Sequence, residues 1–342
     1  MADFWEKDKS YILWRKYIDW STRRSFRKIE TVGTLPPMDS GAWFVVSNHT
    51  HTLMDAMIIL QSRPGKATSF GARADVFRIP IVARFLHFCK ILPLARKGRE
   101  KPEEVAHNRT VMEQIDQVVA HGVPFCLFPE GRHRPMHSLL PLRRGIAMMS
   151  FRSAAQRPTY ILPIGLEYSD WFHFRCSARM TIGEPIDVNA FAASLEPGIE
   201  DSARDQALQE ELFNRLSSLI LYIPDDEHYQ ERLDEIEASK PRKSRFWSIL
   251  TAVLTFPVFL IAAVLSLPLW LTAELVCHFV IKDKAFSNSV RYMVRLFAGP
   301  LVALIEAILA FCFLPWWAAI ILVLLFIPSY SLFYEWLNLA RK

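Results

Sequence analysis

Paired cysteines and a secretion signal are both missing from this sequence of 342 residues. Its five cysteines lie far apart in apolar settings and form no C-x-x-C motif, which indicates reduced thiols in a reducing compartment. The first ten residues carry charges and no apolar run, so we expect no secretory signal peptide. These absences argue against a small secreted protein held together by disulfides.

Clustered basic sequence is also missing. The net charge of +5 comes without a long Lys/Arg stripe or a nucleic-acid-binding motif, so we expect no nucleic-acid partner. A mildly basic chain suits an anionic lipid surface or an anionic substrate.

Charge is scarce in the C-terminal part of the chain. Of the 40 Lys and Arg and 35 Asp and Glu residues, only ten lie in residues 246–342, although 22% of the whole sequence is charged. The sequence therefore predicts a water-soluble part followed by a helical membrane module.

Two apolar blocks, 246–281 and 296–332, make up this module. As a straight helix the first would measure roughly 50 Å, against about 30 Å for a hydrocarbon core, so it must tilt, bend or fold back. Pro257 and Pro268 offer breaks there, and 314–317 offers one in the second block. We predict two hairpins, spanning or re-entrant; the alternative is three spans.

Basic residues border the apolar blocks. If both blocks are hairpins, all three basic clusters fall on one side, which satisfies the positive-inside bias. We therefore predict an integral or deeply embedded protein of a bacterial inner membrane, with its soluble domain in the cytoplasm. Inside the second block, Glu306 is expected to serve helix packing or the interface rather than a functional site. The clusters are Lys240, Arg242, Lys243 and Arg245; Lys282, Lys284, Arg291 and Arg295; and Arg341 and Lys342.

The soluble part divides into three segments. Residues 1–30 are predicted to form an interfacial amphipathic helix, because Trp14 and Ile18 share a helical face amid basic residues. The alternative is an ordinary helix packed on the soluble domain. Residues 31–223 are the predicted α/β domain, and the charged stretch 224–245 is a connector to the membrane module at 246–342.

Short apolar runs alternate with helical patterns in the α/β domain. This alternation predicts a mixed sheet covered by helices on both faces. The predicted strands are 43–47, 68–72, 124–128, 160–166 and 178–182, and the predicted helices are 55–61, 80–88, 102–120, 144–155 and 206–221.

The first of these strands ends in the segment Asn-His-Thr-His-Thr-Leu-Met-Asp at 48–55. A His held by a carboxylate can act as a general base, and α/β proteins place reacting groups at the ends of parallel strands. Other interpretations stay open on these residues alone: Thr52 and Asp55 match a helix capping box, and His49, His51 and Asp55 could ligate a metal. Since no second ligand cluster accompanies them, no metal is predicted.

Four ordered blocks make the chain resemble the glycerolipid acyltransferase family over about residues 43–167. The family includes the lysophosphatidic acid and glycerol-phosphate acyltransferases. The blocks are Asn48-His49 with Asp55; Ile91-Leu92-Pro93-Leu94-Ala95-Arg96; Phe128-Pro129-Glu130-Gly131-Arg132-His133-Arg134, followed by Leu142-Arg143-Arg144-Gly145; and Ile161-Leu162-Pro163-Ile164-Gly165-Leu166.

The resemblance implies a mixed α/β fold and a set of residue roles. His49 would deprotonate an acceptor hydroxyl that attacks an acyl thioester, and Asp55 would orient His49, with no acyl-enzyme intermediate. Arg96, Glu130 and Gly131 would shape the acceptor site. An Arg of the third block, Arg132 or Arg134, would bind phosphate, and Pro163 would line the acceptor site or the acyl channel.

The implied activity is membrane-bound O-acyl transfer in phospholipid biosynthesis. The donor would be acyl-CoA or acyl carrier protein, used as a co-substrate with no further cofactor, and the partners would be membrane lipids and this donor. The expected acceptor is 1-acyl-glycerol-3-phosphate, with glycerol 3-phosphate or another lysolipid as the alternative. A non-catalytic lipid-binding protein and a metal-dependent hydrolase are the competing functions.

Two departures from the family pattern are visible. Five residues separate His49 from Asp55 where four are usual, so the linker must be a loop, or His51 must be the base. We favour His49, which directly follows the strand-end Asn48. In the third block, Arg132 and His133 replace the usual Thr or Ser and Arg, which leaves the phosphate-binding Arg open.

Overall fold

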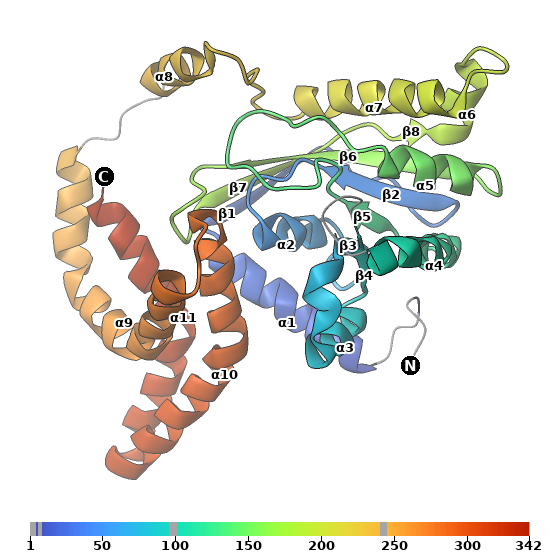
Figure 1. Cartoon of the computed structure of the whole chain (residues 1–342). Helices are drawn as coiled ribbons and strands as arrows, with labels where there is room; N and C mark the ends of the chain where they lie inside the picture. The colour runs from blue at the N-terminus through green and yellow to red at the C-terminus, as the bar shows by residue number, and fades with distance from the viewer. Residues whose placement is uncertain (1–4, 6–8, 96–101, 240–244, 342) are drawn as a thin grey trace.

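The computed structural model describes residues 5, 9–95, 102–239 and 245–341. Within these residues an eight-stranded sheet has the order β1-β7-β6-β2-β5-β3-β4, and β8 also pairs with β6 (Figure 1). The strands are β1 (Lys28–Val32), β2 (Ala42–Ser47), β3 (Ser69–Arg73), β4 (Ile91–Leu94), β5 (Phe125–Leu127), β6 (Thr159–Tyr168), β7 (Ser177–Ile182) and β8 (Ile186–Asp187).

The sheet is mixed, as predicted. Strand β2 lies between β5 and β6 and is parallel to both, whereas β7 and β8 pair with β6 antiparallel. All five predicted strands are present. Strands β1, β4 and β8 were not predicted, because β1 is largely exposed and polar and the other two are very short.

Helices cover both faces of the sheet (Figure 1). Along β2, Trp43 and Val45 join an apolar cluster with α1 and α2, whereas Phe44 and Val46 join a second cluster with α4, α5 and α7. A strand buried on both faces needs a continuous apolar sequence. These helices are α1 (Lys9–Ser25), α2 (Leu53–Ser62), α4 (Pro102–Ala120), α5 (Gly145–Ala154) and α7 (Asp201–Ser218); outside them lie α3 (Pro80–Phe88), α6 (Val188–Ser194), α8 (Tyr229–Ser239) and the short turn η1 (Ala74–Arg78).

Helix α1 packs between the α/β domain and the C-terminal helices. Arg15 is 1% exposed, forms an ion pair with Asp19 and donates to the Leu60 carbonyl at the end of α2 at 2.6 Å. On the C-terminal side, Tyr17 donates to the Leu296 carbonyl at 2.8 Å. This arrangement corresponds to the alternative of a helix packed on the domain, with Trp20 left 43% exposed at its surface.

Three long helices follow the connector: α9 (Arg245–Phe279), α10 (Ser287–Phe313) and α11 (Trp316–Ala340), with the short turn η2 (Lys284–Phe286) before α10. Each of the three is long and apolar enough to cross a membrane by length and composition. The second apolar block therefore forms a helical hairpin that turns at Leu314 and Pro315, inside the predicted break. Of the connector, residues 240–244 lie outside the described residues.

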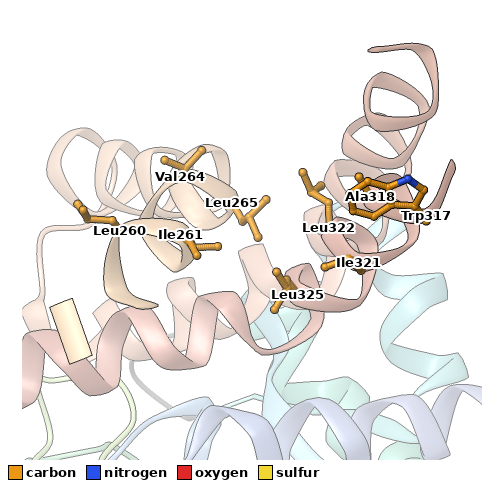
Figure 2. A pocket seen from close by; sticks show the side chains of 9 residues that line it. All are labelled: Leu260, Ile261, Val264, Leu265, Trp317, Ala318, Ile321, Leu322 and Leu325. Atoms are coloured by element: carbon orange, nitrogen blue, oxygen red, sulfur yellow. The ribbon is translucent and has the colours of Figure 1, made fainter. Parts of the chain in front are cut away.

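The first apolar block folds back as one bent helix, not as two helices joined by a turn as a hairpin requires. Helix α9 continues through Pro257 and Pro268. Ala252 accepts a hydrogen bond from Trp336, and Glu274 pairs with Arg291, whose guanidinium lies over the Tyr334 ring. A straight helix would separate residues 252 and 274 by about 33 Å, so α9 must bend, as proline allows. Its middle, Leu260 to Leu265, faces the opposite half of α11 across an apolar groove (Figure 2).

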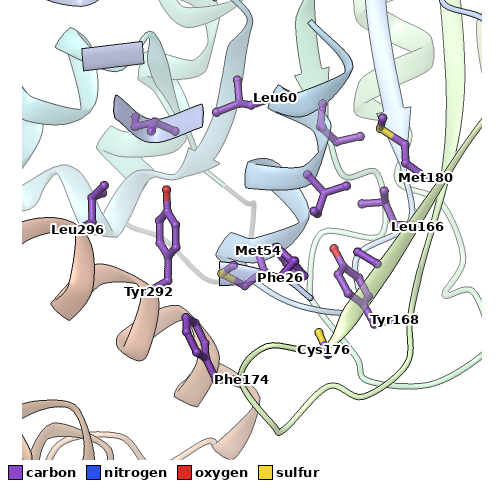
Figure 3. Close-up of a cluster of buried hydrophobic side chains, with 14 of the residues drawn as sticks. Phe26, Met54, Leu60, Leu166, Tyr168, Phe174, Cys176, Met180, Tyr292 and Leu296 are labelled. Carbon is purple, nitrogen blue, oxygen red and sulfur yellow. The ribbon is translucent and has the colours of Figure 1, made fainter. Parts of the chain in front are cut away.

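The soluble domain and the C-terminal helices share one apolar cluster. Tyr292 and Leu296 of α10 pack in the same cluster as Met54 of α2 and Tyr168 of β6 (Figure 3). This continuity holds the C-terminal helices against the end of the sheet where β2 terminates.

Candidate active site

Strand β2 ends at Ser47, and Asn48 then fixes the start of the following loop. The Asn48 side chain donates to the Leu166 carbonyl at 2.9 Å and accepts from the Leu166 amide at 2.7 Å. Asn48 thus prolongs the β2–β6 pairing with its side chain, and this sets where the loop leaves the sheet.

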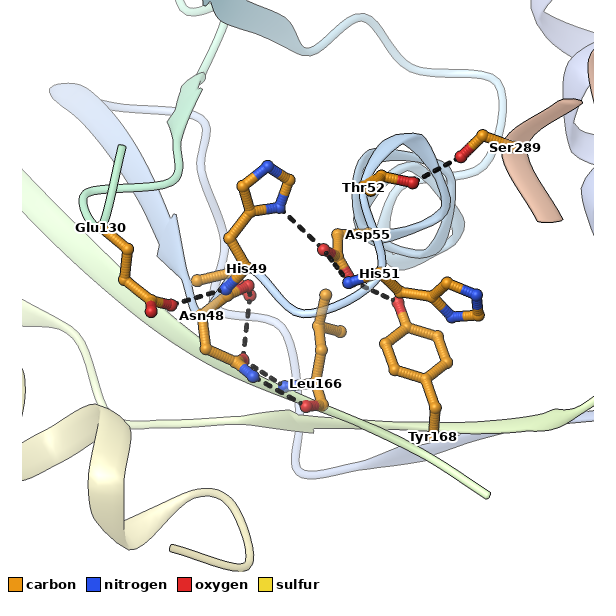
Figure 4. A network of polar contacts seen from close by, with 10 residues as sticks. Asn48, His49, His51, Thr52, Asp55, Glu130, Leu166, Tyr168 and Ser289 are labelled. Carbon is orange, nitrogen blue, oxygen red and sulfur yellow. Dashed lines mark hydrogen bonds and ion pairs between the residues drawn. The ribbon is translucent and has the colours of Figure 1, made fainter. Parts of the chain in front are cut away.

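His49 and Asp55 form a hydrogen-bonded pair at this strand end (Figure 4). His49 Nδ1 lies 2.8 Å from Asp55 Oδ2. The His49 side chain is 19% exposed and that of Asp55 is fully buried. Because Asp55 occupies Nδ1, it favours the tautomer whose Nε2 lone pair is free to accept a proton.

Three donors surround the Asp55 carboxylate. Besides His49, the His51 amide donates to Oδ2 at 2.8 Å and the Tyr168 hydroxyl donates to Oδ1 at 2.7 Å. Such hydrogen bonds stabilise a buried carboxylate in its charged form. Burial beside Asp55 raises the pKa of Tyr168 well above its ordinary value, so Tyr168 remains a donor.

The residues between His49 and Asp55 form a loop that accommodates the fifth intervening residue. Helix α2 begins only at Leu53, after Thr52 with a φ of 53°. Asp55 therefore lies in the first turn of α2 and reaches back to the loop. The capping-box interpretation is not supported, because the Thr52 side chain makes no capping hydrogen bond to α2.

His51 points away from the Asp55 carboxylate and toward α10. It is 1% exposed, and its Nε2 lies 3.0 Å from the Asn288 amide. Burial lowers the pKa of His51 to about 4, so the ring is neutral at physiological pH and accepts from Asn288. This position favours His49 over His51 as the base. It also separates the two rings that the metal-site hypothesis requires to converge.

Glu130 supports the His49 backbone from the third block. Its Oε1 accepts from the His49 amide at 2.7 Å and its Oε2 accepts from the Leu140 amide at 3.0 Å. Burial raises the pKa of Glu130 to about 6. Glu130 thus holds the His49 backbone in place, and its expected part in shaping an acceptor site stays a prediction. Gly131, with a φ of 69°, allows the tight turn after it.

Aromatic rings enclose the His49 imidazole. The Phe128 ring stacks on it with centroids 4.4 Å apart, and the His133 ring lies edge-on at 5.9 Å. His133 in turn lies 3.0 Å from Asp283 and packs against Phe286, both from the turn before α10. The membrane helices therefore contribute residues beside the site.

The arginines expected to bind phosphate differ in their surroundings. Arg134 pairs with Asp225 and Ser138, so its guanidinium is already engaged, and Arg144 pairs with Asp205. Arg132 is exposed, and no side chain in the described part of the chain pairs with it. Arg143 is also exposed and lies beside Gly131. From the sequence, Arg143 was named only as part of the third block and was given no role.

For the two remaining predicted residues, Arg96 and Pro163, the structure describes no contact with the site. Arg96 lies outside the described residues. Pro163 is buried inside β6, opposite Val46, and its carbonyl accepts from Gly183. Among the described contacts, none joins Pro163 to His49 or Asp55, so its place in the site stays a prediction.

Four site residues were missed by sequence reasoning: Tyr168, Asp283, Asn288 and Ser289. Ser289 and Thr52 place their hydroxyl oxygens 2.5 Å apart, and Asn288 also donates to the Trp171 carbonyl at 2.9 Å. Tyr168, Asn288 and Ser289 are separated in sequence by 113 or more residues from their partners in the 49–55 segment. Asp283 is separated from His133 by 150 residues. No group of three or more metal-ligating side chains occurs within the described ranges.

The geometry can be compared with known proteins. Residues 24–167 match the sequence model of the Acyltransferase family, and this range contains His49, Asp55 and Glu130. This match confirms that the four blocks resemble the glycerolipid acyltransferase family and that residues 24–167 form a domain of the acyltransferase type. The predicted mixed sheet is confirmed by the strand pairing.

The proteins similar to this chain include larger ones. Glycerol-3-phosphate O-acyltransferase 2 of Saccharomyces cerevisiae is 30% identical over 143 residues, which are 40% of this chain and 19% of the relative. An uncharacterized acyltransferase of Schizosaccharomyces pombe is 26% identical over 120 residues, 34% of this chain and 18% of the relative. The chain thus spans about a fifth of the length of these relatives.

A solved structure is also similar to this chain. The 1-acyl-sn-glycerophosphate (LPA) acyltransferase PlsC from Thermotoga maritima aligns with 70% of this chain and 87% of its own, with 19% identity and a TM-score of 0.45.

Proposed function

We propose that this acyltransferase transfers a fatty acyl group from an acyl thioester to a hydroxyl of a lysophospholipid, with 1-acyl-glycerol-3-phosphate as the acceptor. The single observation that carries the proposal is the His49–Asp55 pair, in which Asp55 occupies Nδ1 and leaves Nε2 of a partly exposed ring free. An imidazole held in this way is suited to general-base catalysis.

In the proposed reaction, His49 Nε2 takes the proton of the acceptor hydroxyl as its oxygen attacks the thioester carbonyl carbon. Asp55 stabilises the imidazolium that forms, as its short contact with Nδ1 favours. The C–S bond then breaks, the proton passes from His49 to the thiolate, and the products are a carboxylic ester and a free thiol. No covalent bond to the protein is required.

Arg132 and Arg143 are the proposed phosphate-binding groups. Both side chains are exposed. Arg132 lies two residues after Glu130, which accepts a hydrogen bond from the His49 amide. Arg143 follows Leu142 and lies beside Gly131. A guanidinium without an intramolecular partner can bind a phosphate through two parallel hydrogen bonds. We assign Arg134 a structural role instead, since Asp225 and Ser138 already hold it.

Membrane attachment suits this reaction, because a two-chain product belongs in a bilayer. Asp283 and Phe286 bring the start of the apolar hairpin to His133, next to His49. We therefore propose that the lipid acceptor reaches His49 from the membrane surface, with the α/β domain on the cytoplasmic side of a bacterial inner membrane.

The test uses the purified full chain in detergent-containing lipid micelles. Acyl-CoA and acyl carrier protein are compared as donors, and 1-acyl-glycerol-3-phosphate, glycerol 3-phosphate and an uncharged lysolipid as acceptors. We expect turnover with the phosphorylated lysolipid, loss of turnover in His49→Ala with membrane association retained, and full turnover in the exposed control His228→Ala. Turnover that survives in His49→Ala would refute the assignment. Absence of turnover with every donor and acceptor would instead favour a non-catalytic lipid-binding protein.

A further inference from the structure

A cluster of arginines lies where α1 ends against α10 and α11, and none of its described hydrogen bonds or ion pairs is with His49 or Asp55. Arg175 donates to the carbonyls of Arg24 and Phe26 at 2.9 and 2.5 Å, and Arg295 lies 3.4 Å from the Ser25 hydroxyl. Arg24 and Arg295 also share one aromatic neighbour, with their guanidinium carbons 5.0 and 5.9 Å from the centre of the Trp20 ring. Together with Arg27, these residues form the α1-end cluster: Arg24, Arg27, Arg175 and Arg295.

The charge of the α1-end cluster is not balanced. Within the described residues, the carboxylate that pairs with this cluster is that of Glu335, which lies 2.7 Å from Arg175 and 3.6 Å from Arg27. Four guanidinium groups therefore share one carboxylate. Such an excess of like charge at the edge of the protein interior is costly unless an anion is present.

Arg295 makes this imbalance sharper. It is 6% exposed, and its Nη2 is buried without a hydrogen-bond partner. A buried charged donor without an acceptor is rare in native structures and calls for an explanation such as a bound anion. Arg24 is half-buried and Arg27 is exposed, so an anion can reach these two from the surface, while the buried Arg295 and the half-buried Arg175 add positive charge.

The position of the α1-end cluster indicates where such an anion comes from. Two positions to either side of Arg295 along α10 lie apolar exposed residues, Met293 at 45% and Phe297 at 47% exposed, and Trp20, against which Arg295 lies, is 43% exposed. Indole rings and arginines at the start of apolar helices are typical of the headgroup level of a bilayer. A phosphate here belongs to a lipid whose chains can lie along α10.

We propose that the α1-end cluster binds the phosphate of an anionic phospholipid of the surrounding bilayer. This site is separate from the acyl-transfer site, and its existence does not depend on the proposed reaction. The bound lipid fastens α1 to the α10–α11 hairpin by neutralising the arginines between them.

The test is lipid binding by the full chain in a non-ionic detergent. The protein is titrated with dioctanoyl phosphatidylglycerol, with dioctanoyl phosphatidylcholine as the neutral-headgroup control and with inorganic phosphate to distinguish a lipid from a free anion. Native mass spectrometry counts the bound lipid, and the thermal unfolding midpoint reports stabilisation. We expect one phosphatidylglycerol to bind and to raise the midpoint, whereas the other two ligands do neither at equal concentration.

Matched variants separate a site from general charge attraction. The double variant Arg24→Gln with Arg27→Gln removes two charges of the cluster, one half-buried and one exposed, and should weaken binding at least about tenfold. The control Arg23→Gln with Lys28→Gln removes the same charge from neighbouring residues, which contact Gln61 and Glu30 instead, and should keep the affinity within about twofold. Equal losses in both doubles, no loss in either, or equal stabilisation by inorganic phosphate would overturn the proposal.

Discussion

The hydroxyl oxygens of Thr52 and Ser289 lie 2.5 Å apart and join the loop that carries His49 to the first turn of α10. The neighbouring pair, His51 and Asn288, makes a second contact between the same two segments at 3.0 Å. Both loop residues lie between His49 and Asp55, where this chain has five residues instead of the four usual in the family that it resembles. The longer loop therefore connects the His49–Asp55 pair with α10.

We predict that Asn288→Ala lowers kcat by roughly tenfold with little change in the KM for the acyl donor. The variant removes the donor that holds the buried His51 ring, whose Nδ1 already lacks a partner, and leaving a buried polar group unsatisfied costs about 1–3 kcal/mol. The loop that positions Asp55 through the His51 amide should loosen as a result. Steady-state kinetics of the acyl transfer measure the effect.

Asn338→Ala is the matched control for Asn288→Ala. Asn338 of α11 also donates to a backbone carbonyl of the α/β domain, that of Phe174 at 2.7 Å, but does not touch the loop. Hydrogen exchange of the peptide covering residues 48–55 should increase in Asn288→Ala and not in Asn338→Ala. This readout does not require turnover, so equal exchange in the two variants contradicts the coupling whatever the enzyme acts on.

A second prediction concerns the donors of Asp55. Asp55→Asn should reduce kcat by about 10³–10⁴-fold, because an amide favours the wrong tautomer of His49. Tyr168→Phe removes one of the three donors to Asp55 and should reduce kcat by only about tenfold, since His49 and the His51 amide remain in place. If the two variants lost activity equally, Tyr168 would have to contact the substrate itself.

A third prediction is an acid-labile contribution of His51 to stability. Burial lowers the pKa of His51 from 6.5 to about 4. Between pH 6.5 and pH 4, His51 is therefore protonated in the unfolded chain and neutral in the folded chain. The contribution of the neutral His51 to the free energy of unfolding is fully present above pH 6.5 and is lost as the pH falls toward 4. At pH 5 the free energy of unfolding is lower by about 2 kcal/mol. The pKa of Glu130, raised to about 6, acts in the opposite direction, because its protonation stabilises the fold as the pH falls toward 4.5.

His51→Gln isolates the histidine, since the Gln side chain can still accept from Asn288. The thermal midpoint of the wild type should fall more between pH 7 and pH 5 than that of the variant, with Glu130 titrating equally in both. If the thermal midpoints of the two proteins changed in parallel with pH, the pKa of His51 would not be lowered in the folded protein.

The pairing of His49 with Asp55 could be predicted from the sequence because its determinants are local. His49 directly follows an apolar strand, and Asp55 comes six positions later at a helix start. The supporting residues were not visible for the opposite reason. Tyr168 reaches Asp55 across 113 residues and Asn288 reaches His51 across 237, and local periodicity carries no information on such contacts. The roles of Arg132 and Arg134 could not be separated either, because Asp225, which engages Arg134, lies 91 residues further along the chain.

The membrane module shows how far composition alone can be taken. Its apolar blocks and the turn at Leu314 and Pro315 follow from hydropathy and proline placement. The course of α9 does not, because the same prolines can end a helix or merely bend it. Packing decides between these outcomes here: Phe259 and Trp270, on the two arms of α9, both contact the Phe333 ring of α11, at 5.6 and 6.0 Å.

The α10–α11 hairpin is predicted to cross the bilayer fully. From Leu296, which follows the second basic cluster, to the end of α10 the helix rises about 27 Å, close to the roughly 30 Å of a hydrocarbon core. Its turn is flanked by Trp316 and Trp317, 70% and 56% exposed, which suit the far interface. A cysteine placed at the turn should therefore be reachable only from the face opposite the α/β domain.

The measurement uses Leu314→Cys in a chain whose exposed Cys312 is replaced by Ser, reconstituted in sealed vesicles of known orientation. A membrane-impermeant maleimide should label it from the far side alone, and an Arg341→Cys control should be labelled from the domain side, because the two residues lie at opposite ends of α11. Labelling of Leu314→Cys from neither side before detergent is added would mean that the hairpin is re-entrant and ends inside the bilayer. In that case the glutamate within α10, Glu306, would lie nearer the headgroups of the domain side than a full span allows.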